Sequence, residues 1–377
     1  MSTQSSLSSN ETSNFTEAAN GSYSDEEFKK YDEPSLDDWP YFDLHGYGHW
    51  STVLAIAIIG TIGNIFQFIM MSDSKLCSLS YSVYLKFLAV SDSLVLSEAL
   101  FQQTQIRFNL PMVVDMNNAL CKIVVGYQVF AMLLSPWLVV GLTLDRFVCV
   151  CFPLTRGRFC TMKKAIAVCS SMIAATIVLI IPNLVLTNLK YNRCLPSAKI
   201  IYYFMFVRLV VSTLVPCAVI LTLNIAIIAR IKRSNEFRNT FIKNKADSTK
   251  DNSTRPLVLI SVLAFVTLLP IATSDAIAAL FFVFLKTGRR AALLSLKLWP
   301  AFHIFYLLNF GQNFFILMAS SQNYRQIMKS KLRCFSLKMK QTRYNVPAPS
   351  VGSTVNTDDI SLSVITSNTI RSEMTDP

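Results

Sequence analysis

The stretch that decides the fold reads VVGLTLDRFVCVCFPL and runs from Val139 to Leu154. Two adjacent charges, Asp145 and Arg146, interrupt an apolar run there. A charged side chain inside a bilayer costs free energy, so such residues usually face a protein interior and serve a function. An acid and a base near the end of an apolar helix therefore point to a membrane protein with a site at that end.

The composition indicates a membrane protein over most of the chain. Of the 377 residues, 52% are hydrophobic and only 15% are charged, whereas soluble domains average about 25% charged residues. Apolar runs of about 20 residues cross a bilayer as helices, because the backbone must bond within its own segment. We predict an all-α membrane protein, a seven-transmembrane helix bundle over 51–319. The spans are expected near 51–72, 82–104, 118–152, 164–186, 200–231, 256–285 and 297–319.

The distribution of Lys and Arg predicts the orientation of the bundle. The loops after spans one, three and five and the carboxyl-terminal tail hold 20 of these residues, and the even loops hold nine. Since cytosolic loops carry the excess, we expect a multi-pass plasma-membrane protein with an extracellular amino terminus. The net charge of +12 then reflects topology and contact with membrane lipids. Nucleic-acid binding is not needed to explain it.

Residues 1–50 are predicted to form an extracellular, glycosylated, acidic tail. They contain ten acidic residues and two Lys, and they are too polar to form a core. The tail is either a lure for a cationic ligand or a solvated segment resting on basic outer loops. Three glycosylation sequons lie on this expected outer side, at Asn10, Asn14 and Asn20.

The segment after the last span divides into two parts. Residues 320–335 alternate apolar residues with cations and predict a short amphipathic helix on the membrane surface, where Cys334 is a candidate for palmitoylation. Residues 336–377 are rich in Ser and Thr and predict a disordered cytoplasmic tail. Its phosphorylation would create negative charge for an Arg-rich partner, which makes receptor kinases and arrestin candidate partners.

The nine cysteines are sorted by the predicted topology. Cys121 and Cys194 alone lie at the outer edge, so they form the one plausible disulfide. The other cysteines do not stand with His or Cys at zinc-ligand spacing. No metal site is predicted.

Polar residues within the spans fall into two groups. In the middle, Asp92 in span two has small polar partners available on other spans, which suits either a structural network or a sodium- or proton-sensitive switch. Nearer the outer side, four ionisable residues could line a water-filled mouth. There they would contact a ligand or pair with one another, Arg208 with Asp275 or Glu98. These four are Glu98, Arg208, Asp275 and His303.

These features together resemble a rhodopsin-like (class A) G-protein-coupled receptor. Cys121 opens span three, and Asp145 and Arg146 follow it by 24 and 25 residues, as in that family. The match covers roughly 51–335, and its motifs keep their order. They are GNIFQF in span one, LAVSD in span two, LDRF in span three, Pro216 in span five, Pro270 in span six and LLNFGQNFFIL in span seven.

The resemblance implies a switch at the cytosolic end of span three. Asp145 would restrain the inactive state. Arg146 would face the cavity that takes the tail of a heterotrimeric G protein once span six swings outward. Phe147 stands where the family usually has Tyr.

The resemblance also implies two further sites. Cys121 and Cys194 match the family's disulfide. The family's sodium pocket matches Asp92, Ser135, Asn309 and Asn313. No cofactor is expected, and an allosteric sodium ion is left open.

Several family positions carry other residues. Leu268 replaces the span-six Trp, Asn224 replaces the span-five Tyr, and span seven reads NFFIL from Asn313, without the usual Pro and Tyr. Lys250 stands where an acidic residue is often found at the base of span six. These departures bear on how the switch moves and how efficiently it couples to a G protein.

The ligand class follows from local comparisons. Gln128 stands seven residues after Cys121, where amine receptors have Asp, so a biogenic amine is not expected. Mid-span seven holds Leu307 and Leu308 and no Lys for retinal. The segment FPLTRGRFCTMKKA resembles the second inner loop of peptide receptors, particularly invertebrate neuropeptide receptors. We therefore expect a neuropeptide, with Gln128 and the four outer ionisable residues lining its pocket.

Two receptor alternatives stay open, and other classes do not fit. A chemosensory receptor for small molecules tolerates divergent switch motifs, and a decoy would bind ligand without signalling. An enzyme is not expected, because the three His are His45, His49 and His303, all predicted outside, and HExxH is absent. A transporter would show repeated spans, which the sequence lacks.

Overall fold

The computed structural model describes residues 46–190, 193–196, 198–241, 254–278, 280 and 289–344. The acidic tail, its three sequons at Asn10, Asn14 and Asn20, Lys250 and most of 336–377 lie outside the described residues, and so does the side chain of Cys334. The chain divides into one unit through Tyr324 and a second from Arg325. Each unit is described by itself.

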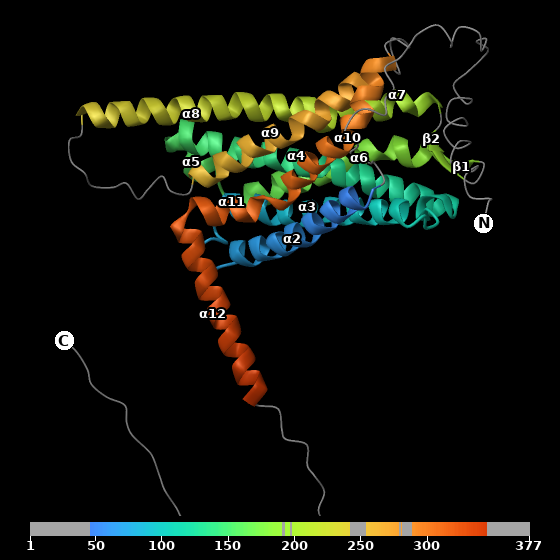
Figure 1. The fold of residues 1–377 in the computed structure, drawn as a ribbon. Helices are drawn as coiled ribbons and strands as arrows, with labels where there is room; N and C mark the ends of the chain where they lie inside the picture. The colour runs from blue at the N-terminus through green and yellow to red at the C-terminus, as the bar shows by residue number, and fades with distance from the viewer. Residues whose placement is uncertain are drawn as a thin grey trace, which may run out of the picture. The chain divides into compact units, whose positions relative to one another are not determined.

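The described part of the first unit is helical apart from one β-hairpin (Figure 1). Its long helical rods are α2 (Tyr47–Met71), α3 (Ser80–Arg107), α4 (Asn118–Cys151), α6 (Met162–Leu186), the continuous α7 (Ala198–Phe206), η5 (Val207–Leu214) and α8 (Val215–Phe241), α9 (Thr254–Ala278), and the pair α10 (Arg289–Gly311) and α11 (Asn313–Ser320). Short elements are η3 (Val113–Asp115), η4 (Pro153–Thr155), α5 (Arg156–Phe159), β1 (Thr187–Lys190) and β2 (Arg193–Pro196). These rods are the predicted spans in order.

Two of the long helices, α4 and α6, begin at a residue whose side chain caps the first turn. The side chain of Asn117 accepts a hydrogen bond from the backbone N–H of Leu120 at 2.8 Å, which starts α4. Thr161 does the same for Lys164 at 3.4 Å at the start of α6. Such caps satisfy backbone donors that the first turn leaves open. The starts of α4 and α6 are therefore determined by neighbouring residues in the sequence, whereas the α10–α11 bend depends on contacts with distant residues.

Length and composition agree with a membrane bundle. Among the described residues, five helices are long and apolar enough to span a bilayer, and the bent α10–α11 pair raises this to six. The helix α3 does not pass this test, and it packs against α2, α4 and α6. Large apolar side chains are exposed on the outside of α2 and α6, such as Ile59 at 55% and Val178 at 64%. Lipid covers such faces in a membrane protein, so they need no protein partner.

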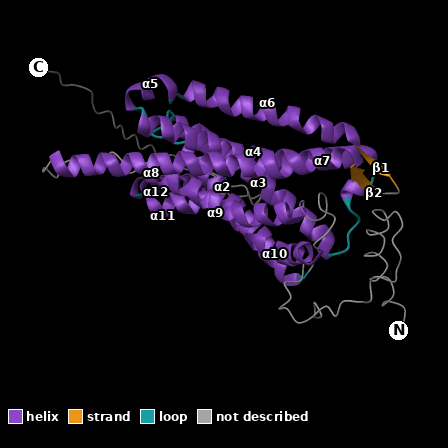
Figure 2. Ribbon diagram, turned by 90° about the horizontal axis from the view of Figure 1, so that it is seen from above, coloured by secondary structure: helices purple, strands orange, loops and turns teal. Residues whose placement is uncertain are grey.

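The helix α4 lies at the centre of the bundle. It packs against α3, α6, α8 and α9, and α6 lies at the edge in the second view (Figure 2). The hairpin β1–β2 lies at one end of the bundle and α5 at the other (Figure 1). We call these the hairpin end, which carries Cys194, and the Arg146 end.

The second unit is described only through the helix that leads into it. The helix α12 runs from Gln322 to Tyr344, where the sequence predicts a short amphipathic helix over 320–335. Apolar Ile327, Met328 and Leu332 alternate along it with cations. The helix continues nine residues beyond the predicted 320–335, and its place on the membrane surface stays a prediction.

Candidate functional site

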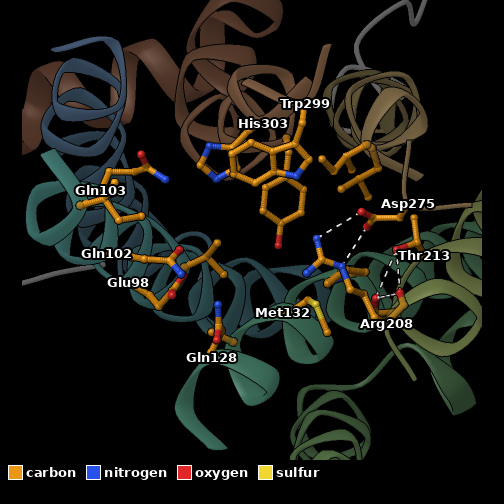
Figure 3. A pocket seen from close by; sticks show the side chains of 18 residues that line it. Glu98, Gln102, Gln103, Gln128, Met132, Arg208, Thr213, Asp275, Trp299 and His303 are labelled. Atoms are coloured by element: carbon orange, nitrogen blue, oxygen red, sulfur yellow. Dashed lines mark hydrogen bonds and ion pairs between the residues drawn. The ribbon is translucent and has the colours of Figure 1, made fainter. Parts of the chain in front are cut away.

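A cavity of about 220 Å³ opens within the bundle between α3, α4, η5, α9 and α10 (Figure 3). The structure brings all five predicted ligand-pocket residues to its wall, although they come from five separate elements. They are Glu98, Gln128, Arg208, Asp275 and His303. Gln102, Gln103, Met132, Trp299 and Tyr306 also line it, and the sequence did not single them out.

One side of this cavity is fixed by an ion pair between η5 and α9. Arg208 donates from Nε to Asp275 Oδ2 at 2.9 Å and from Nη2 to Asp275 Oδ1 at 3.3 Å (Figure 3). Both side chains are partly exposed, at 32% and 21%. Of the two pairings that the sequence leaves open for Arg208, the structure has the one with Asp275. A bidentate contact fixes the guanidinium plane and leaves it facing the cavity.

The wide turn that carries Arg208 explains its position. The segment η5 is a π-helix, Val207–Leu214, and such turns leave backbone carbonyls without their usual α-helical partners. The Arg208 carbonyl accepts from the hydroxyls of Ser212 and Thr213. The Val211 carbonyl accepts from the Trp137 indole N–H at 3.0 Å. The irregular turn is thus held by side chains on both α4 and η5 itself.

Glu98 lies on the opposite wall of the cavity, on α3 (Figure 3). Its side chain is half-buried, and among the described residues it makes no hydrogen bond or ion pair. A half-buried carboxylate without a protein donor needs water or a ligand to solvate it. Arg208 acts on Glu98 only through longer-range electrostatics, since its ion pair is made with Asp275.

Aromatic rings close the third side. His303 stacks on Trp299 with ring centroids 4.6 Å apart and planes 10° apart, and Tyr306 follows at 6.2 Å. His303 Nδ1 lies 3.4 Å from His49 Nε2 on α2. Positions 299, 303 and 306 share one helix face. That spacing could have predicted Trp299 and Tyr306, although aromatic residues within a span are more often read as facing lipid.

A covalent bond ties the hairpin to the bundle. The sulfurs of Cys121 at the start of α4 and Cys194 in β2 are bonded. The Cys194 N–H also donates to Asp115 Oδ1 at 2.6 Å, and the Leu189 N–H donates to Asn118 Oδ1 at 3.1 Å. Among the described residues, one covalent bond and these two hydrogen bonds fasten the hairpin to α4 and η3.

A buried polar cluster lies between the cavity and the Arg146 end. Ser135 donates to Asp92 Oδ1 at 2.5 Å, and the Asn313 amide donates to Asp92 Oδ2 at 2.8 Å. The oxygen of Asn309 accepts from Thr267 on α9 at 3.4 Å, and its grouping with Asp92 stays a prediction. The carboxylate and hydroxyl oxygens of Asp92 and Ser135 are of the kind that hard cations prefer. Asp92 and Ser135 thus provide oxygens that fit a small cation. Asn313 orients the Asp92 carboxylate.

The acid–base pair from the opening stretch is buried at the Arg146 end. Arg146 Nε donates to Asp145 Oδ2 at 3.2 Å, and Arg146 Nη2 contacts the same oxygen and Ser80. Ser80 donates to Asp145 Oδ2 at 3.0 Å. Asp145 and Arg146 are only 9% and 6% exposed, and Phe147 packs edge-on against Phe152 at 5.8 Å. A buried ion pair is stable only when close contact and hydrogen bonds offset the cost of removing both charges from water. Losing one partner leaves an uncompensated buried charge.

A helical bundle with this order of motifs and a buried Asp-Arg pair at one end can be compared with known families. The family model described as "7 transmembrane receptor (rhodopsin family)" matches residues 63–337, which is most of the chain. The chain belongs to the rhodopsin family of seven-transmembrane receptors. The predicted family is therefore confirmed, together with its fold class and a multi-pass membrane location.

The bend in the seventh span of this receptor does not need the missing Pro. The helices α10 and α11 meet at 58° around Gln312. Asn64 on α2 donates to the Phe310 carbonyl at 3.1 Å, just before the bend. Gly60 and Gly311 let α2 and α10 approach closely here, because a Cβ on Gly60 would lie 2.9 Å from the Gly311 Cα.

The other departures of this receptor also have structural counterparts. Asn224, in place of the span-five Tyr, accepts a hydrogen bond from Ser261 on α9 at 2.8 Å. Leu268, in place of the span-six Trp, is buried and lines the cavity floor. At the position of the family's span-five Tyr, Asn224 thus links α8 directly to α9. At the position of the span-six Trp, an aliphatic side chain lines the cavity.

Proposed function

We propose that this receptor converts binding of a basic neuropeptide at the Glu98 cavity into activation of a heterotrimeric G protein at the Arg146 end. The observation that carries the ligand class is Glu98, a half-buried carboxylate on the cavity wall that has no donor among the described residues. A guanidinium or ammonium group of a ligand would complete it. Asp275 is unavailable for this role because it already pairs with Arg208.

The size of the cavity favours one end of a peptide over a compact ligand. Pockets for drug-sized molecules measure about 300–1,000 Å³, and this one measures about 220 Å³. That space accepts one or two side chains. The aromatic wall of Trp299, His303 and Tyr306 suits an apolar or aromatic residue next to the cation.

The proposal includes the orientation of the bundle in the membrane. The hairpin end would face outward, so that the acidic tail could attract a cationic peptide toward the cavity by long-range electrostatics. The Arg146 end would face the cytosol and the G protein. Receptor kinases and arrestin would act on the Ser- and Thr-rich carboxyl-terminal tail.

An allosteric sodium ion is part of the proposed regulation. Asp92 and Ser135 would hold it, and Asn313 would keep the carboxylate in place. A cation would supply positive charge that offsets the buried carboxylate. These residues lie between the cavity and the Arg146 end.

A chemosensory receptor for small molecules is the second candidate function, because that class tolerates divergent switch motifs such as Leu268 and Asn224. A decoy receptor is the third, favoured by Leu268 and by the loss of Pro and Tyr in span seven. The peptide proposal and these two alternatives give different results when the receptor is exposed to native ligands.

The test exposes cells expressing the receptor to fractionated tissue extract, with and without protease treatment, and records G-protein dissociation. We expect a response that protease removes and that Glu98→Gln lowers by ten-fold or more in potency, equivalent to about 1.4 kcal/mol. Phe101→Ala, an exposed position one turn along α3, is the matched control and should respond as the wild type. A protease-resistant response would favour a small molecule, and binding without dissociation would favour a decoy.

A further inference from the structure

Two cysteines meet beside the Asp145–Arg146 pair. Cys149 lies one turn after Asp145 on α4, and Cys160 lies between α5 and α6. Their Sγ atoms are 2.7 Å apart, with Cys149 donating to Cys160. Cys160 in turn donates to the Asp145 carbonyl at 3.6 Å. The pair is therefore continuous with the backbone that holds the buried acid–base pair.

We propose that Cys149 and Cys160 form a reversible disulfide when exposed to a peroxide. A disulfide needs an S–S distance of about 2.05 Å, so closing the bond from 2.7 Å requires a movement below an ångström. Both side chains are half-buried, so a molecule as small as hydrogen peroxide reaches them. Cys169 and Cys217 are buried and have no described cysteine partner.

A metal site is the rival explanation for this cluster. The Asp145 carboxylate and the two sulfurs lie within 4.8 Å of one another. Two thiolates on a tetrahedral zinc ion, with Zn–S near 2.3 Å, lie about 3.8 Å apart, which is over an ångström longer than the distance found here. Asp145 is also engaged by Arg146 and Ser80. The geometry thus favours a bond between the sulfurs over a shared ion.

The chemistry balances with peroxide as the oxidant. One thiol attacks an oxygen of hydrogen peroxide, the O–O bond breaks, and a sulfenic acid and one water form. The second thiol attacks the sulfenic sulfur, the S–S bond forms, and a second water leaves. The two sulfurs lose two electrons in total, and peroxide is reduced to water. Two equivalents of a monothiol such as glutathione restore both thiols and become a disulfide themselves.

The raised pKa of the Cys160 thiol slows this reaction. Burial raises the pKa of the Cys160 thiol, and the hydrogen bond from Cys149 and the charge of Asp145 raise it further, while Arg146 lowers it. A higher pKa means less thiolate at neutral pH, and the thiolate is the nucleophile. Cys160 is therefore a slow nucleophile at neutral pH, and the disulfide forms only under a sustained peroxide supply.

The bond would close a loop around η4 and α5 and fasten it to α4 beside Arg146. If this end binds a G protein, which rests on the proposed function above, fastening the loop would reduce G-protein activation. The disulfide itself does not depend on that function. The two parts can therefore be tested separately.

The chemical test uses the purified full chain in lipid nanodiscs. It is treated with hydrogen peroxide, remaining thiols are alkylated, and the peptides are mapped under non-reducing conditions. We expect a Cys149–Cys160 cross-linked peptide and the loss of both thiols from the alkylation map. The cross-link should be absent in Cys149→Ser and in Cys160→Ser. It should persist in Cys151→Ser, because Cys151 lies two residues along α4 on another face.

Two results would overturn the proposal. In the first, Cys149 and Cys160 stay alkylatable at peroxide doses that oxidise Cys77 or Cys151. In the second, the purified chain holds zinc that either Ser variant releases, which would establish the metal site instead. A separate arm measures extract-driven G-protein dissociation before and after peroxide in wild type and Cys149→Ser. A cross-link without a fall in dissociation would leave the disulfide standing and remove its link to coupling.

Discussion

Asn64 on α2 donates a hydrogen bond to the carbonyl of Phe310 on α10, 246 positions away in sequence, at 3.1 Å. The carbonyl lies just before the 58° bend between α10 and α11. In the family this bend contains a Pro, and here position 314 is Phe. The seventh span thus keeps a bend whose backbone is satisfied by another helix.

Removing this bond should destabilise the receptor. Asn64→Leu leaves the Phe310 carbonyl buried without its donor, and side-chain hydrogen bonds between membrane helices are worth about 0.6–1.7 kcal/mol. We expect the unfolding temperature of the purified receptor to fall by about 1–7 °C. Ile65→Ala, at a neighbouring position that is 53% exposed, is the control and should change it less. Equal effects of both variants would argue against a role for this bond.

Close approach of α2 and α10 predicts different effects at two glycines of one helix. A Cβ on Gly60 would meet the Gly311 backbone at 2.9 Å, whereas a Cβ on Gly63 would meet only Phe side chains, the nearest at 3.3 Å. Gly60→Ala should therefore force the helices apart and lower the unfolding temperature, and Gly63→Ala should have the smaller effect because side chains can shift. Thermal unfolding of both variants checks the order. The reverse order would contradict this packing.

The Asn224–Ser261 bond between α8 and α9 predicts a change in basal signalling. If α9 moves away from α8 on activation, breaking this buried bond should favour the active state. We expect Asn224→Ala and Ser261→Ala each to raise G-protein activation without ligand, and the double variant to add little to either. Surface expression is matched by labelling. Additive or absent effects would show that the bond does not restrain α9.

The Asp92 cluster predicts a sodium effect. Replacing sodium chloride by choline chloride at constant ionic strength should change the potency of an active extract fraction in wild type. It should have no effect in Asp92→Asn, which keeps the side-chain shape and removes the charge. Ser135→Ala should weaken the effect, because it removes one of the two residues of the proposed site. A sodium effect that survives in Asp92→Asn would place the ion elsewhere.

The sequence predicted the positions of the helices well, because each membrane span needs a run of about 20 apolar residues. Each predicted span overlaps a described helical rod, although residues 281–285 of the sixth span lie outside the described residues. The helix α3 carries too many polar residues to pass as a span by itself. Glu98, Arg208, Asp275 and His303 were placed near one another from depth alone, and they do line one cavity. Depth is readable because each helix rises by a constant amount per residue.

The remaining contacts depend on helix rotation and on loops, which the sequence does not show directly. Asn309 was grouped with Asp92 from the family resemblance, whereas the bond between its oxygen and Thr267 on α9 appears only in the structure. The π-helix that presents Arg208 has no sequence signal of its own. Cys149 and Cys160 meet only because η4 and α5 fold back on α4. The substitutions Asn224 and Leu268 were visible, whereas the bond that Asn224 makes was not.

The central claim is that this rhodopsin-family receptor activates a G protein through the buried Arg146. The most direct measurement is G-protein dissociation in cells expressing wild type or Arg146→Ala at equal surface density, exposed to the same active extract fraction. We predict a dose-dependent response in wild type and its loss in Arg146→Ala, with binding of the fraction retained by both. An equal response from both would contradict the account, because the charge that Asp145 and Ser80 hold would then have no part in coupling.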